Sequence, residues 1–99
     1  MEFSPEIYQL GTLKLGENRD AKFTRETASK LVVNIEPGCG CTQIVATRYE
    51  IVATLSAPHE LPEGVKEAGD TSFDTQKWIS LQFDDDTFET LFIEATITA

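Results

Sequence analysis

The chain has 99 residues, of which 40% are hydrophobic, and a formal charge of −9 from 17 acidic and 8 basic side chains. This length fits one domain with one modest core and leaves little room for a deep substrate cavity. The negative charge repels phosphate backbones and anionic lipid, so we expect neither a nucleic-acid partner nor a membrane partner. The charge suits a basic partner surface, and it is equally consistent with a role in solubility alone.

The chain begins at Met1 with no basic n-region and no apolar h-region, and no run approaches the ~20 apolar residues of a membrane span. We therefore expect no leader in this chain. A leader removed from a longer precursor would instead place the domain in the periplasm.

The first half of the chain is predicted to form three strands, at residues 3–10, 21–27 and 30–36, with a short apolar–polar alternation at 11–16 and a polar turn at 17–20. Pro5 is typical of an edge segment. In the second strand, Ala21, Phe23 and Arg25 are expected to share one side. The third strand ends at Pro37 and the glycine after it, a strong breaker pair.

Residues 43–57 are ambiguous because Ile-Val-Ala-Thr occurs twice, with a spacing compatible with a helix. The β-branched content and an apolar alternation favour two strands with a bend near residues 47–48. The alternating residues are Tyr49, Ile51, Ala53 and Leu55. Residues 58–72 are predicted to form the longest loop, and a loop of this length in a small domain is often functional.

A C-terminal hairpin is the strongest local signal. Its strands are expected at residues 76–83 and 87–98, separated by three aspartates. A three-residue loop places Ile79 opposite Leu91 and Trp78 opposite Phe92. We prefer this register because a four-residue loop would mix the apolar and polar faces. The core residues are then Ile79, Leu81, Phe83, Leu91, Ile93 and Ile97.

The opposite face of this hairpin carries Trp78, Phe88 and Phe92. Exposed aromatic residues that lie together often mark an interface, so these three are candidate interface residues. The alternative is that the second sheet or the long loop covers them. Six or seven short strands with no convincing helix predict an all-β fold, an Ig-like antiparallel β-sandwich of about seven strands, as a single domain over residues 1–99.

The segment Cys39, Gly40, Cys41 and Thr42 contains both cysteines of the chain. A disulfide between them needs a bend, which Gly40 permits. Two thiolates are half of a zinc site, but His59 is the only histidine. A redox pair more typically has two residues between its cysteines. We favour a structural role, with the thiols packed at a tight turn, over a redox or crosslinking role and over metal binding.

This segment resembles the signature of a bacterial and phage family of unknown function, whose members carry Cys-Gly-Cys-Thr in an Ig-like domain similar to the Hydin-like, or ASH, class. The opening phrase at residues 10–17, the strand starts at 21–23 and 31–35, and the closing hairpin at 78–97 also resemble that family. The resemblance implies an Ig-like fold. It implies no agreed activity and no catalytic residue.

Other candidate sites are weaker. The aspartates at 84–86 could bind calcium together with Asp74, but their spacing is not that of an EF-hand loop, and a solvated hairpin tip is the favoured interpretation. His59 is expected to be an exposed loop residue. The chain has no nucleophile elbow and no glycine-rich phosphate loop, so we expect no catalytic residue, no metal and no cofactor.

These observations favour a non-enzymatic protein-interaction or structural module. The resemblance to a family with phage members favours a small virion component, such as a capsid decoration (cement) protein that binds the major capsid protein or another virion protein. Self-association through sheet edges is a further option. The alternative is a bacterial envelope or cytoplasmic accessory domain with a redox or structural Cys-Gly-Cys pair, and a hydrolase or metal enzyme is third.

Overall fold

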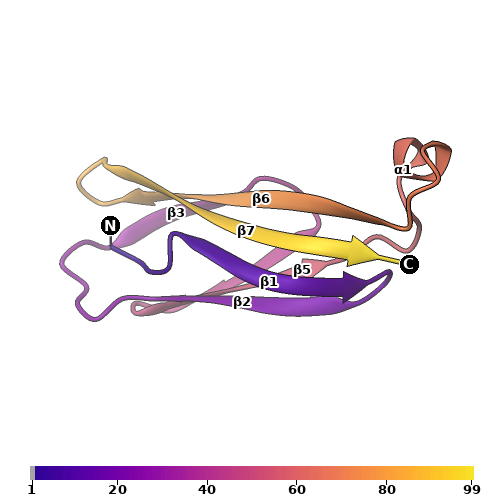
Figure 1. The fold of residues 1–99 in the computed structure, drawn as a ribbon. Helices are drawn as coiled ribbons and strands as arrows, with labels where there is room; N and C mark the ends of the chain where they lie inside the picture. Colours follow the sequence, from indigo (N-terminus) through magenta and orange to yellow (C-terminus); the bar gives the residue numbers. More distant parts are fainter. Residues whose placement is uncertain (1) are drawn as a thin grey trace.

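Alternating apolar and polar residues build seven strands, which a computed structural model arranges in two packed layers (Figure 1). The model describes residues 2–99. The elements in chain order are β1 (Ile7–Lys14), β2 (Asn18–Thr24), β3 (Val32–Pro37), β4 (Thr42–Ala46), β5 (Glu50–Ser56), α1 (Glu63–Glu67), β6 (Ser72–Phe83) and β7 (Phe88–Thr98). The predicted all-β sandwich of about seven strands is confirmed.

One layer has the strand order β1-β7-β6-β3 and the other has the order β2-β5-β4. This division separates the second, fourth and fifth strands from the third, sixth and seventh, as in an Ig-like sandwich. Four of the five strand pairings are antiparallel, whereas β1 runs parallel to β7. β1 therefore adds one parallel edge strand to an otherwise antiparallel sandwich. The first strand, β1, lies beside the last, β7, in the four-stranded sheet. The chain then crosses to the other sheet at β2.

The hairpin formed by β6 and β7 has the predicted register. Trp78 pairs with Phe92 and Ile79 pairs with Leu91. The six residues predicted to lie in the core are all at most 2% exposed, because they occupy alternate positions on the face that meets the second sheet. β6 begins at Ser72, earlier than predicted, and so extends beyond the body of the sandwich toward α1 (Figure 1).

The N-terminal half differs from prediction in its boundaries. Gly11 does not separate two segments. It has a φ of +79° and lies at a register shift inside β1, where its missing Cβ tolerates the left-handed conformation of a bulge. β2 begins at Asn18, so the predicted polar turn at 17–20 is mostly strand. Glu17 accepts hydrogen bonds from the Lys14 backbone N–H and from Arg19, and these hold the pKa of its carboxyl below the usual range.

The predicted division of residues 43–57 into two strands is confirmed, with the bend between Ala46 and Glu50. Ile51 and Leu55 are at most 1% exposed, whereas Tyr49 lies at the bend and is exposed. The loop at 58–72 contains α1, which the sequence did not predict because one helical turn with no buried residue has no detectable period. No helix within residues 2–99 is long and apolar enough to cross a membrane.

Among residues 2–99, Arg25 is the one buried charged residue, and its side chain is 2% exposed. It directly follows β2 and is buried on the same side as Ala21 and Phe23, as predicted. Its Nη1 lies 3.2 Å from a carboxylate oxygen of Glu2, and its Nε donates to the backbone carbonyl of Arg48 at 2.8 Å. Arg25 thus ties the N-terminal segment and the β4–β5 bend to the end of β2.

Candidate functional site

The outer face of the four-stranded sheet carries a row of apolar side chains. Ile7 of β1 pairs with Phe92 of β7, which pairs with Trp78 of β6, so the three lie side by side across neighbouring strands. Phe88 lies four residues before Phe92 on β7, so the two side chains are on the same face of the strand. We call Ile7, Trp78, Phe88 and Phe92 the aromatic patch. The structure therefore brings together all three candidate interface residues.

The aromatic patch is open to solvent. Trp78 is 43% exposed and Phe88 is 67% exposed, so the alternative that the second sheet or the long loop covers them is wrong for these two residues, while Phe92 is half-buried. Sequence reasoning missed Ile7, because its place in the patch depends on the parallel pairing of β1 with β7, which no local pattern indicates. Exposed apolar side chains are common singly, but neighbours on three adjacent strands form a continuous apolar surface.

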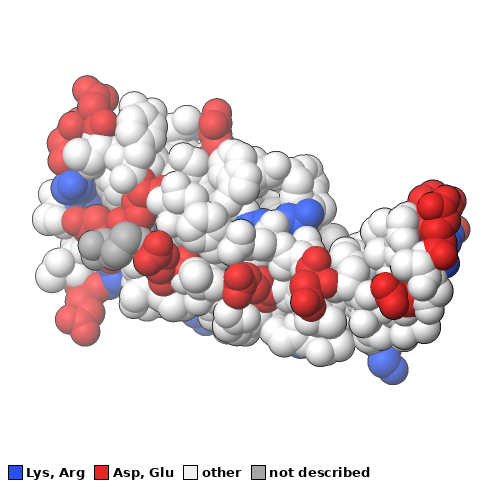
Figure 2. All heavy atoms as spheres, turned by 45° about the horizontal axis from the view of Figure 1, so that its top comes forward, with Lys and Arg blue, Asp and Glu red and all other residues white. Residues whose placement is uncertain are grey.

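Acidic groups lie next to this surface on the same face. Glu94 accepts hydrogen bonds from Gln9 on β1 and Gln76 on β6, and Asp74 accepts one from Thr96. These contacts hold the carboxylates along the same outer face. Figure 2 looks toward the side of β6 and β7 and shows acidic groups distributed along the length of the molecule beside largely uncharged surface. The arrangement fits a partner surface that is apolar and basic.

Gly38 positions Trp78 within the patch. A Cβ built on Gly38 would lie 2.6 Å from Cε2 of the Trp78 ring, which is closer than real Cβ atoms come, so the indole packs directly on the glycine backbone. The Gly38 N–H also donates to the Trp78 carbonyl at 2.8 Å. The Pro-Gly pair that ends β3 therefore fixes the tryptophan beside the start of the cysteine turn.

We expect Gly38→Ala to displace the Trp78 ring from its packing position on residue 38. The added methyl group overpacks the contact, and the expected loss in the free energy of unfolding is about 1 kcal/mol. Trp78 is the only tryptophan, so its fluorescence emission should move to longer wavelength as the ring becomes more solvated. Gly64→Ala is the matched control, because nothing lies within 4 Å of a Cβ there. Unchanged emission in Gly38→Ala would contradict the packing described.

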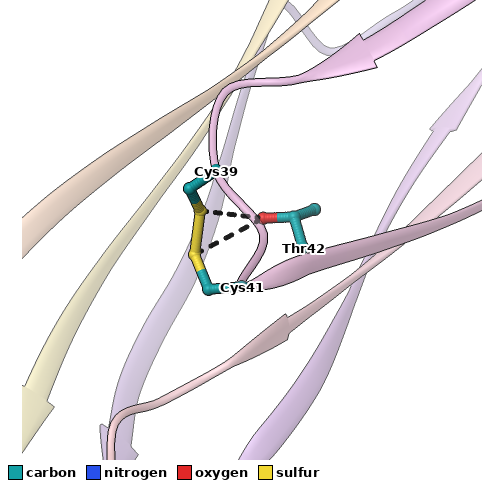
Figure 3. The surroundings of a disulfide bond; sticks show 3 residues. All are labelled: Cys39, Cys41 and Thr42. Carbon is teal, nitrogen blue, oxygen red and sulfur yellow. Dashed lines mark hydrogen bonds between the residues drawn. A yellow bond between two sulfur atoms is a disulfide. The ribbon is translucent and has the colours of Figure 1, made fainter.

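Cys39 and Cys41 form a disulfide with an S–S distance of 2.00 Å and a Cα–Cα distance of 5.3 Å (Figure 3). That Cα separation lies within the usual range for disulfides of roughly 4.4–6.8 Å. The pair is thus bridged, and the interpretation as two packed free thiols is wrong. The Thr42 hydroxyl lies to one side of the S–S bond, 3.8 Å from Sγ of Cys39 and 3.9 Å from Sγ of Cys41 (Figure 3). Thr42 itself is 6% exposed and begins β4.

The bridge closes a very small ring, so it constrains the unfolded chain little. From the dependence of chain entropy on loop length, we expect the double variant Cys39→Ser, Cys41→Ser to lose about 1.5 kcal/mol or less in the free energy of unfolding. Urea unfolding of the oxidised protein and of the variant measures the difference. A loss above about 3 kcal/mol would show that the bridge supports the sandwich far beyond its own turn.

The remaining predicted site residues do not converge. Asp85 accepts hydrogen bonds from the Thr87 hydroxyl and the Thr87 backbone N–H, and it forms an ion pair with Lys30. These contacts together lower the pKa of the Asp85 carboxyl. Asp84 accepts a hydrogen bond from the Leu31 N–H, while Asp74 lies near the opposite end of β6. His59 is exposed. Among residues 2–99, no group of three or more His, Cys, Asp or Glu side chains could hold a metal ion.

Comparisons of the chain with protein-family models, with curated proteins and with solved structures found no match. The aromatic patch is therefore the candidate functional site on the strength of its own geometry.

Proposed function

We propose that this chain is a non-enzymatic Ig-like interaction module that contacts a larger protein through the aromatic patch. The observation that carries the proposal is the row of Ile7, Phe92 and Trp78 across three hydrogen-bonded strands, extended along β7 by Phe88. Interfaces typically gain most of their energy from a few central aromatic anchors surrounded by polar contacts. Trp78 has the features of such an anchor.

The patch is built on rigid elements, which favours binding. Three of its four residues, Trp78, Phe88 and Phe92, belong to the long β6–β7 hairpin, and the Trp78 ring packs on Gly38. Side chains that are already ordered lose less conformational entropy when a partner covers them. The acidic neighbours on the same face add a charge preference for a basic partner and increase the rate of encounter at low salt.

The setting that we propose is a virion, where the module would decorate the capsid by binding the major capsid protein or another virion protein. This part of the proposal is supported by the resemblance of residues 39–42 and their flanking strands to a family with phage members, and by the small size and acidic charge of the chain. Decoration needs one stable contact surface, and the aromatic patch on the β6–β7 hairpin offers one.

Mass spectrometry of purified particles from the source tests the setting. The proposal predicts that the chain is present in particles. It also predicts that Trp78→Ser lowers its occupancy about tenfold or more, as expected for loss of an aromatic anchor. Tyr49→Ser is the matched control, because Tyr49 is similarly exposed but lies at the bend between β4 and β5, outside the four-stranded sheet. Absence of the chain from particles would contradict the virion setting, and equal occupancy of both variants would contradict the role of the patch.

A second candidate function is favoured by the disulfide. Bridged cysteines persist in oxidising compartments, which fits an accessory domain of the bacterial envelope with a structural or redox Cys39–Cys41 pair. Thiol labelling in intact cells, followed by mass measurement, distinguishes the two candidates. Labelling of both cysteines before any reductant is added would rule out this second function.

A further inference from the structure

The two long sides of the sandwich differ. On one side, β1 and β2 are joined by a tight turn and pack against each other. On the other side, β3 and the β4–β5 bend diverge and leave a groove of about 430 Å³. Leu31 and Val33 line it from the β3 side, and Ala46 and Arg48 line it from the bend.

Both strands beside this groove are sheet edges. β3 is the outermost strand of its sheet and β4 is the outermost strand of the other, so each presents backbone groups that pair with no strand among residues 2–99. Natural edges are usually protected by charges, prolines or covering loops. β4 has no charged residue and no proline, and β3 carries its charged residue and proline, Glu36 and Pro37, only at its end, beyond the groove lining. Leu31 and Val33 are 47% and 59% exposed, and Val33 lies at a register shift in β3.

The charged side chains that line the groove are positive, although the net charge of the chain is negative. Its lining contains Arg25 and Arg48 and no acidic residue, in a chain of net charge −9. Arg25 is neutralised by Glu2, whereas Arg48 forms no ion pair within residues 2–99. Nε of Arg25 donates to the backbone carbonyl of Arg48. This hydrogen bond holds the β4–β5 bend, and with it the Arg48 residue, at the end of the groove.

We propose that this groove binds an extended segment of a partner protein, with alternating apolar side chains and at least one carboxylate. The segment adds to β3 as a further strand through backbone hydrogen bonds, its apolar side chains pack on Leu31 and Val33, and its carboxylate pairs with Arg48. This is a second binding surface, separate from the aromatic patch. A second copy of this chain fits less well, because two copies of charge −9 repel each other.

A displayed library of random dodecapeptides, selected on the folded protein at low salt, tests the proposal. Enriched peptides are expected to combine β-branched residues with Asp or Glu. Their synthetic copies should bind Val33→Asp about tenfold more weakly, because the variant places a negative charge in the groove. Thr12→Asp, an exposed strand position on β1 with the same charge change, is the control. Arg48→Ala should weaken binding about threefold, and Lys14→Ala should not.

Mapping the bound peptide by amide NMR shifts completes the test. Shifts confined to residues 31–35 and 46–48 support the proposal, and so does weaker binding at higher salt. Failure to enrich any peptide, or equal binding to Val33→Asp and Thr12→Asp, would overturn it. Shifts on Trp78 and Phe92 would assign the peptides to the aromatic patch instead. A dimer in sedimentation that Val33→Asp dissociates would make the groove a self-association site, and this too would overturn the proposal.

Discussion

Replacing Leu91 by alanine is expected to lower the free energy of unfolding by about 3 kcal/mol, as for other large-to-small changes in a packed core. Leu91 is fully buried and lies opposite Ile79 in the β6–β7 pairing. The loss combines the transfer energy of the side chain with the cavity left between the sheets. Urea or thermal unfolding monitored by circular dichroism measures it.

Phe88→Ala on the same strand is the matched comparison. Phe88 is 67% exposed and belongs to the aromatic patch, so its removal should change the free energy of unfolding by less than about 0.5 kcal/mol. Binding to a partner should fall instead. A large stability loss in Phe88→Ala together with a small one in Leu91→Ala would mean that the two faces are inverted by a one-residue slip.

Arg25→Ala is expected to have the second large effect, a loss of about 3 kcal/mol in the free energy of unfolding. The substitution leaves the Glu2 carboxylate without its ion-pair partner and with only the Ser29 hydroxyl as a donor. It also removes a donor to the Arg48 carbonyl and takes the guanidinium from the Phe3 ring, whose centroid is 4.7 Å away. An unpaired, partly buried charge is the main source of the loss. Thermal unfolding at neutral pH measures it.

Lys22→Ala is the control for this prediction. Lys22 also forms an ion pair, with Glu50, but at 3.8 Å and with its side chain 58% exposed, so its loss should cost less than about 0.5 kcal/mol. Glu2→Gln removes the charge and retains hydrogen-bonding capacity, and its cost should be smaller than that of Arg25→Ala. Equal stability of Arg25→Ala and Lys22→Ala would contradict the structural role of Arg25.

The C-terminal hairpin was predictable because strand period and face burial act on the same residues. Ile79, Leu81, Leu91 and Ile93 alternate with polar or aromatic neighbours, so only one register keeps the apolar set together. The same two-residue period predicted which side of β2 is buried. The sequence also indicated two of the three neighbours in the aromatic row, since Trp78 and Phe92 are cross-strand partners in that register.

The remaining features depend on contacts between distant parts of the chain. Ile7 joins the patch only because β1 pairs with the last strand, and Gly38 is needed only because an indole from β6 packs on it. The groove beside Arg48 arises from the divergence of two sheet edges. None of these leaves a local period in the sequence. The bridge between Cys39 and Cys41 was one of several states that two cysteines at this spacing allow.

Radical footprinting of the aromatic side chains, in cells that produce the chain and in the purified protein, tests the central claim most directly. Trp78 and Phe88 are accessible in the isolated chain, and Tyr49 at the β4–β5 bend is an internal reference of similar exposure. If the aromatic patch is an interface, oxidation of Trp78 and Phe88 should fall several-fold in cells relative to Tyr49. Equal oxidation of all three side chains in both samples would contradict the assignment of this face to a partner.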